Sequence, residues 1–534
     1  MGRDGRSAEV SKAAGVVGFF TFLSRILGLV RDMVIARFFG SGTAADAFFV
    51  AFRIPNLLRR LFAEGSLTIA FIPVFTEYLS VKGKKEAMEL ASVVATLLSV
   101  VLVFLVAAGI LLSPWIVRLQ AFGFGGTGYK YELTVLLTRM MFPYILLVSL
   151  VALFMGVLNS LRHFAAPAAA PILLNVAIIA GAYLFSPMMD EPVLGLALGV
   201  IIGGMLQVSL QIPWLQRCGF SFRARWRPSH PAVRRIVTLM LPAIYGSAVY
   251  QVNQFIGTLL ASMLKEGSIS WLYYADRLIQ FPLGVFAIAI STAALPSLAT
   301  DAAEKDMDHF RSTFSHALRL TFFITLPSMV GLMVLGHELI AVFFQRGAFG
   351  VEATIMTAKA LICYAVGLWA FSGIRVMVSA FYALQDTRTP VRVATLALLI
   401  NITLSLLLMK PFGHSGLALS LSLASGVQFL LLLYFLKDKL GTAYLRNLTA
   451  SLAKASAASL IMGTMLLSLS SVNIGSGLQA SSLFAVLRIT LLVAAGVIVF
   501  LLAAYVMRSP ELSSVGGIFS SMMSKISGAK RSHP

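Results

Sequence analysis

The sequence predicts an all-α polytopic membrane protein with about fourteen transmembrane helices. Hydrophobic residues make up 58% of the 534 positions and charged residues only 12%, about half the charged share of a soluble domain. Apolar runs recur along the whole chain, and each is long enough to cross a bilayer, which takes roughly 20 residues. Alternating segments of about ten residues, typical of a membrane barrel, do not recur.

Each expected span is an apolar run that is bounded by polar or charged residues. In chain order we expect spans at residues 10–39, 44–78, 88–116, 132–158, 165–187, 192–215, 233–263, 268–299, 311–336, 352–384, 390–409, 414–436, 446–470 and 481–507.

Loop charge predicts the orientation. Roughly 24 basic residues lie in the loops and tail on the side of the N-terminus and roughly 5 on the other side, so both termini are expected in the cytoplasm. The net charge of +20 does not indicate nucleic acid, because the basic residues are dispersed in short loops without a basic domain interleaved with aromatic residues. We expect them to contact lipid headgroups instead.

The chain also repeats itself at an offset of about 222 residues. Gly195 to Leu198 (GLAL) recurs from Gly416, Gln207 recurs as Gln428, and Pro73 recurs as Pro296. A duplicated six-span unit predicts two lobes in parallel orientation with a substrate site between them. We expect an N-lobe at 1–216, a basic cytoplasmic linker at 217–235, a C-lobe at 236–440, two added helices at 441–510 and a cytoplasmic tail at 511–534.

Charged residues interrupt the first two spans. Ionisable groups at membrane depth are costly, so they normally face a protein interior or a water-filled cavity. On a helical period Arg25 and Asp32 share one face, whereas Asp46, Arg53 and Glu64 form a stripe along the second span. Arg60 lies on the stripe of the second span, one turn before Glu64, whereas Arg31 and Arg59 lie off these stripes. An excess of arginine over carboxylate indicates an anionic ligand or water in the cavity. The alternative is a set of structural ion pairs with snorkelling side chains at the helix ends.

The second half of the chain contributes Asp276 and Arg277 within SWLYYADRLIQFP. If the lobes are pseudo-symmetric, Arg277 faces the same cavity as the arginines of the first lobe. Several arginines around one cavity suit a diphosphate, because guanidinium binds phosphate in a bidentate way and stays charged. The alternative is that Asp276 and Arg277 form a capping or interhelical pair.

Motifs of enzymes are missing: the chain has no P-loop, no H-E-x-x-H and no G-x-S-x-G. Cys218 and Cys363 lack metal-type spacing, and we expect no metal and no cofactor. A membrane glycosyltransferase would need carboxylates near a large loop, and a scaffold would not need intramembrane arginines. A drug or polysaccharide exporter is the alternative among transporters.

SRILGLVRDMVIARFFG, followed by DAFFVAFRIPNLLRRLFAEGSLTIAFIPVF and later by FQRGAF, closely resembles the MurJ (MviN) family of lipid II flippases. The resemblance covers about the first 440 residues. It implies the fold of the multidrug/oligosaccharidyl-lipid/polysaccharide exporter superfamily. It also implies transport of the undecaprenyl-diphosphate-linked peptidoglycan precursor, lipid II, from the inner to the outer leaflet.

The resemblance implies functional roles for Arg25, Arg31, Asp46, Arg59 and Arg277, and a gate position for Glu64. Together with the charge pattern, it leads us to expect substrate contacts at Arg25, Arg31, Asp32, Arg53, Arg59 and Arg277, and gates at Asp46 and Glu64. The expected partners are lipid II and membrane lipids, with the peptidoglycan synthesis machinery as a further candidate, and we expect a monomer. The two added helices are candidates for a groove that holds the prenyl tail.

Overall fold

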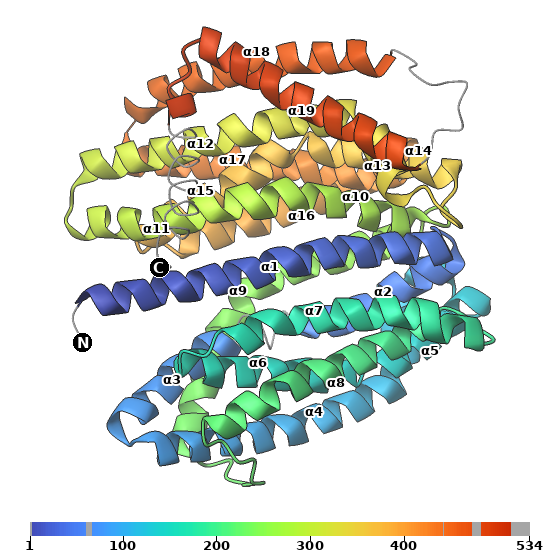
Figure 1. The fold of residues 1–534 in the computed structure, drawn as a ribbon, viewed down its shortest axis with the longest axis vertical. Coiled ribbons are helices and arrows are strands. Elements are labelled where there is room, and N and C mark those ends of the chain that lie inside the picture. Colours follow the sequence, from blue (N-terminus) through green and yellow to red (C-terminus); the bar gives the residue numbers. More distant parts are fainter. Residues whose placement is uncertain (1–2, 60–66, 442, 472–481, 514–534) are drawn as a thin grey trace, which may run out of the picture. The chain divides into compact units, whose positions relative to one another are not determined.

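The structure, a computed structural model, describes residues 3–59, 67–441, 443–471 and 482–513 (Figure 1). This part of the chain is helical and contains no strand. The first half holds α1 (Arg3–Phe39), α2 (Thr43–Leu58), α3 (Thr68–Val81), α4 (Lys84–Gln120), η2 (Phe122–Phe124), α5 (Tyr129–Met141), α6 (Tyr144–Ser160), α7 (Ala165–Ala180), η3 (Gly181–Phe185), η4 (Ser186–Met188), α8 (Leu194–Arg217) and α9 (Pro231–Ser262). The second half holds α10 (Ser268–Pro282), η5 (Leu283–Ala287), α11 (Ile288–Ala303), α12 (Met307–Val334), α13 (Gly336–Phe344), α14 (Val351–Ala365), α15 (Leu368–Ala383), α16 (Arg388–Phe412), α17 (His414–Leu440), α18 (Ala443–Ser471) and α19 (Ser482–Val506).

Every expected span corresponds to one of these helices or to a consecutive group of them, so the predicted all-α membrane class is confirmed. Ten of the described helices are long and apolar enough to cross a membrane, or eleven if the bent pair α14 and α15 is one span. The expected count of about fourteen is consistent with this. The sequence did not predict the short helix α13.

The bend between α14 and α15 has a local cause. The two helices meet at 42°, and the backbone N–H of Gly367 bonds the carbonyl of Tyr364 rather than that of Cys363. The hydroxyl of Ser422 on α17 donates to the carbonyl oxygen of Cys363 at 2.7 Å. A neighbouring helix therefore satisfies the backbone acceptor that the bend exposes, as a break inside a membrane requires.

The chain forms two compact units, residues 1–270 with 346–350, and residues 271–345 with 351–534. Each is described by itself below. Helix α9 belongs to the first unit by compactness, although the repeat assigned it to the C-lobe. The lobes inferred from the repeat remain a prediction, because compactness does not test duplication.

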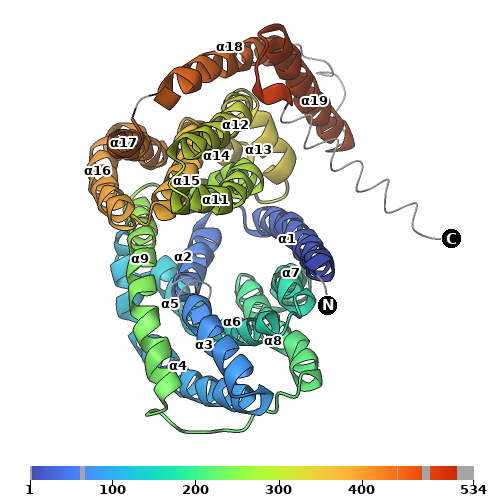
Figure 2. The ribbon, with the colours of Figure 1, turned by 90° about the vertical axis from the view of Figure 1, so that its left-hand side faces the viewer.

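Small residues bring helices close together in the first unit. Figure 2 shows α7 and α8 side by side, and their backbones approach at two glycines. A Cβ atom at Gly199 would lie 2.7 Å from the carbonyl oxygen of Ala177, and one at Gly203 would lie 2.9 Å from Leu174 Cδ1. In lipid, such close packing replaces the hydrophobic effect as the source of helix association.

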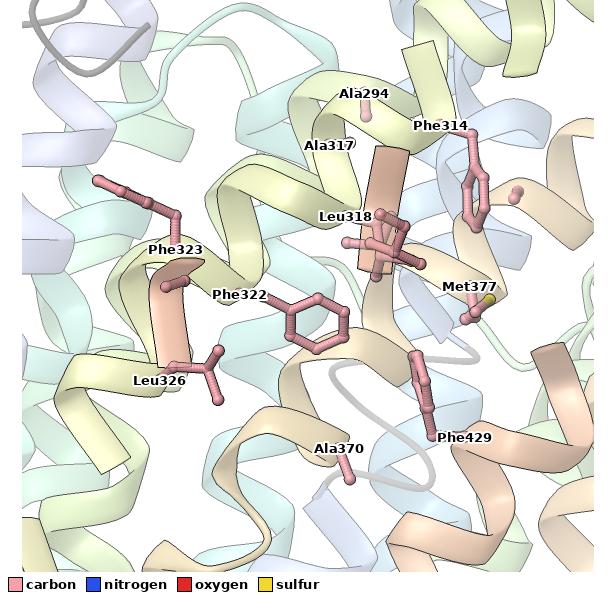
Figure 3. Close-up of a cluster of buried hydrophobic side chains, with 14 of the residues drawn as sticks. Ala294, Phe314, Ala317, Leu318, Phe322, Phe323, Leu326, Ala370, Met377 and Phe429 are labelled. Carbon is pink, nitrogen blue, oxygen red and sulfur yellow. The ribbon is translucent and has the colours of Figure 1, made fainter. Parts of the chain in front are cut away.

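A large apolar cluster organises the second unit (Figure 3). Phe322 of α12 packs edge-to-face on Phe429 of α17, with ring centroids 5.7 Å apart. Phe323, the next residue, lies 5.0 Å from Phe500 of α19. Because consecutive residues of α12 point in different directions, this helix contacts α17 with one side and the added helix α19 with another.

Candidate functional site

A buried cluster of polar side chains joins α1 and α7 in the first unit. Arg31 donates from Nε and Nη2 to Asp32 Oδ1 at 3.0 and 2.7 Å, and from Nη1 to Asn175 Oδ1 at 3.1 Å. The amide of Asn175 donates in turn to the carbonyl of Ser24 at 3.1 Å. Arg31 is 7% exposed and Asp32 is fully buried. The positive charge thus lies beside a carboxylate and an amide oxygen, which is how a charge is tolerated at membrane depth.

Helical periodicity placed Arg25 and Asp32 on one face of α1. In the structure the carboxylate of Asp32 is engaged by its neighbour Arg31, whereas Arg25 is exposed. Asn175 was not predicted from the sequence. A signal was present, since this amide is alone in the apolar run LLNVAII and a buried amide needs hydrogen-bond partners.

Asp46 on α2 is a carboxylate with four hydrogen-bond donors and is 1% exposed. Its Oδ2 accepts from Lys130 Nζ at 2.8 Å and from the backbone N–H of Gly267 at 2.9 Å. Its Oδ1 accepts from the backbone N–H and the hydroxyl of Ser270 at 3.0 and 2.6 Å. Gly267 and Ser270 lie at the start of α10, so Asp46 supplies the cap and the negative charge that a helix N-terminus prefers.

The remaining arginines of α2 have different neighbours. Arg53 donates to the hydroxyl of Thr258 on α9, and more weakly to the carbonyl of Gln254 at 3.4 Å. Arg59 donates from Nε to Asn56 Oδ1 at 2.9 Å, one turn earlier on the same helix. The predicted stripe therefore contacts α5 and the start of α10 through Asp46, and α9 through Arg53. Glu64, the second expected gate, lies outside the described residues.

Arg277 lies on α10 in the second unit and is half-buried. Its Nη2 donates to the hydroxyl of Tyr273 at 2.6 Å, and its guanidinium carbon lies 5.2 Å from the centre of the same ring. Asp276 accepts from Gln280 Nε2 at 3.4 Å. The tyrosine one turn earlier thus orients the guanidinium by a hydrogen bond and a cation–π contact, neither of which adds negative charge.

The guanidinium group of each of these arginines can bind an anion, since its N–H donors match phosphate oxygens. Among the residues that the structure describes, no three His, Cys, Asp or Glu side chains converge as metal ligands.

Comparison with known proteins decides the family. The family model described as "Lipid II flippase MurJ" matches residues 35–488. The chain belongs to the MurJ family of lipid II flippases. A probable lipid II flippase MurJ of Vibrio cholerae is 39% identical over 433 residues, which cover 80% of this chain and 82% of the relative. The lipid II flippase MurJ of Burkholderia cenocepacia is 38% identical over 432 residues, covering 80% and 84%.

Solved structures agree with this MurJ assignment. A lipid II flippase MurJ in an inward closed conformation superposes with a TM-score of 0.76 at 28% identity, covering 92% of this chain and 98% of that one. An inward-facing transporter of the multidrug resistance MATE family superposes with a TM-score of 0.66 at 13% identity, covering 81% and 99%. At that identity the second likeness shows a shared fold and nothing about substrate.

Proposed function

We propose that this protein is a lipid II flippase, which moves the undecaprenyl-diphosphate-linked peptidoglycan precursor from the inner to the outer leaflet of the bacterial cytoplasmic membrane. It is a transporter and not an enzyme. The observation that carries the proposal is the family match, which runs from residue 35 to residue 488 and so includes the charges of the second span, among them Asp46 and Arg53, as well as Arg277.

The charge chemistry supports this substrate. A diphosphate carries negative charge into a low-dielectric region, and guanidinium groups stabilise it with short, charge-assisted hydrogen bonds. We assign substrate contacts to Arg25, Arg31, Asp32, Arg53, Arg59 and Arg277, of which Asp32 acts by holding Arg31. A drug exporter with a cationic substrate would be expected to carry a lone buried carboxylate. The surplus of arginine over carboxylate argues against a drug exporter.

Alternating access requires contacts that exist in only one state, because contacts that are equal in both states shift nothing. We assign this gating role to Asp46 and to Glu64. The bonding of Asp46 to Lys130, Gly267 and Ser270 supports the first assignment, since it supplies a set of contacts that a conformational change can break together.

The remaining assignments follow the same proposal. Both termini lie in the cytoplasm, the protein works as a monomer, and α18 and α19 supply the groove for the prenyl tail. Membrane lipids surround the spans, and enzymes of peptidoglycan synthesis are the candidate protein partners.

The test is leaflet-resolved accessibility of lipid II after depletion of this protein in its own host. We expect the precursor to become inaccessible to a reagent that acts only from outside, and re-expression of the intact chain to restore access. Unchanged access after full depletion would refute the flippase assignment. A drug exporter would instead give normal precursor access together with altered drug sensitivity.

A further inference from the structure

The connection between α8 and α9 is built as a strap on the first unit, visible in Figure 2 as the thin green segment between these helices. We define the strap as residues 220–227, which are non-helical. At its start Phe220 is buried and its ring centroid lies 6.0 Å from that of Phe154. The carbonyl of Ser221 accepts from Ser92 Oγ at 3.3 Å. The strap therefore packs against α4 and α6 of the first unit, in addition to being joined to α8 and α9.

The basic and the aromatic side chains of the strap have different surroundings. Arg225 and Arg227 both reach the carboxylate of Glu89 on α4, the latter at 3.1 Å, and the backbone N–H of Arg225 donates to Thr96 Oγ1 at 3.0 Å. Trp226, which stands between these two arginines in the sequence, is 61% exposed, and Phe222, which precedes them, is 56% exposed. Ion pairs with Glu89 thus hold the strap on α4, while two large aromatic rings remain exposed.

The depth of the strap follows from α4. After Glu89 this helix carries no charged residue until Arg118. At 1.5 Å per residue that run is about 42 Å long, which exceeds the hydrocarbon core of roughly 30 Å, so its ends reach into the headgroup layers. The strap meets α4 between Glu89 and Thr96, at one end of the run. Its exposed rings therefore lie at the depth of a membrane interface.

A neighbouring feature at the end of α8 supports this depth. The guanidinium of Arg217 lies 5.3 Å from the centre of the Trp214 ring, and His163 lies 6.1 Å from the same ring. Tryptophan beside arginine at the end of a span is typical of the interfacial belt. The strap continues this belt onto a segment that does not itself span the bilayer.

We infer that the strap is an interfacial anchor whose ligand is the phospholipid headgroup layer on the side of the α8–α9 connection. Trp226 inserts at the level of the headgroups, where its amphipathic ring is favoured, and Phe222 adds apolar area that is removed from water. Exposed Arg223 binds lipid phosphate, while Glu89 balances charge at Arg225 and Arg227. The inference does not depend on the transported substrate and concerns how the unit is held at a fixed depth.

The test uses spin labels on the full-length chain in vesicles. With Cys218 and Cys363 replaced by alanine, a label at Ala224→Cys reports on the strap, because this exposed residue lies between the two rings in sequence. A label at Ser229→Cys, exposed in the following turn, is the aqueous reference. In vesicles of phosphatidylcholine with phosphatidylglycerol we expect several-fold lower collision with a water-soluble nickel chelate at Ala224 than at Ser229. Equal collision at the two sites would overturn the anchor.

Two variants separate lipid shielding from shielding by protein. Phe222→Ser with Trp226→Ser should raise the collision rate at Ala224 to that at Ser229, whereas an unchanged rate would overturn the proposal. Arg223→Gln should abolish any difference between vesicles with and without phosphatidylglycerol, and a persisting difference would remove Arg223 from the assignment. A label at Val101→Cys, exposed in the middle of α4, checks folding because it should stay accessible to oxygen in every variant.

A soluble protein partner is the rival occupant. Shielding of Ala224 that occurs in native membranes but is absent in vesicles of pure lipid would assign the rings to such a partner and refute the lipid anchor. Lipid II transport is measured separately in the same vesicles, so that failure of the anchor and failure of the flippase assignment are distinguishable.

Discussion

Arg31 in the first unit and Arg277 in the second are both arginines in apolar helices, yet they are held in different ways. Arg31 is 7% exposed and its guanidinium bonds a carboxylate and an amide. Arg277 is half-buried and bonds the hydroxyl of Tyr273, whose ring also faces its guanidinium. The first arrangement resembles a structural ion pair, whereas in the second a tyrosine helps to orient the positive charge.

The contrast separates two effects of replacing an intramembrane arginine or its partner: loss of folding stability and loss of anion binding. A buried pair is stable only as a pair, because removal of one member leaves an uncompensated charge. A guanidinium that is oriented by tyrosine depends less on that partner for its own burial, so its replacement should affect binding of an anion more than folding. The predictions below test this separation, from the largest expected effect to the smallest.

Asp32→Ala should be the most damaging substitution for stability. It leaves the Arg31 guanidinium buried without the carboxylate, and loss of one partner of a buried pair costs about 3–5 kcal/mol. The measurement is the apparent melting temperature of the purified protein in detergent, compared with that of the wild type.

The double variant Arg31→Leu with Asp32→Leu is the control, because apolar replacement of both partners is often neutral. We expect it to recover most of the lost melting temperature. If the double variant is as unstable as Asp32→Ala, the cluster contributes through packing and not through charge.

Asp46→Asn should have the next largest effect. Asn keeps one acceptor oxygen toward Ser270 but turns an NH₂ group toward two donors, the N–H of Gly267 and the ammonium of Lys130. Leaving buried groups unsatisfied costs about 1–3 kcal/mol, again measured as a fall in melting temperature. Ser270→Ala, which removes only one hydroxyl donor, should cost less. A larger loss in Ser270→Ala would mean that the hydroxyl and not the carboxylate holds the start of α10.

Arg277→Lys should lower stability less than Asp32→Ala does, because lysine keeps the positive charge of this half-buried position. Transport should nevertheless fail, since an ammonium lacks the planar pair of donors that matches a diphosphate. Complementation of a depletion strain measures transport, and the melting temperature measures folding. Tyr273→Phe is the matched control because it keeps the ring and removes the hydroxyl. Full complementation by Arg277→Lys would refute a bidentate contact.

Much of the fold was predictable because hydropathy alone places the helices, and the described residues of each expected span are mostly helical. The side-chain partners were not predictable to the same degree. Arg31 and Asp32 are adjacent, so helical periodicity points their Cβ atoms in different directions, and their bond depends on the length of the guanidinium. Their third partner, Asn175, lies 144 positions away. Half of the donors to Asp46 are backbone N–H groups, which no pattern of side chains reveals.

The smallest effect is expected at Asp386, in the loop between α15 and α16 of the second unit. Its Oδ2 lies 2.6 Å from Lys439 Nζ and accepts from the hydroxyl of Thr389 at 2.8 Å. Its Oδ1 accepts from the backbone N–H of Thr389 at 3.0 Å. Burial raises the pKa of this carboxyl, but the hydrogen bonds from Lys439 and Thr389 outweigh it and hold the pKa well below its usual range. Unlike Asp32, this carboxylate pairs with a lysine that is 39% exposed, so the pair is worth between zero and about 1 kcal/mol.

The sign of the pH dependence follows from that direction. A carboxyl whose pKa is lowered by folding stabilises the protein fully above its unfolded pKa, and this contribution is lost as the pH falls through the folded pKa. The melting temperature of Asp386→Asn should therefore lie slightly below that of the wild type by a constant amount between about pH 5 and pH 8. Asp438→Asn, an exposed carboxylate beside the same lysine in sequence, controls for loss of charge alone. If the difference at Asp386 disappears as the pH falls from about 6 to 5, its pKa is not lowered and the loop pair does not stabilise this end of α16.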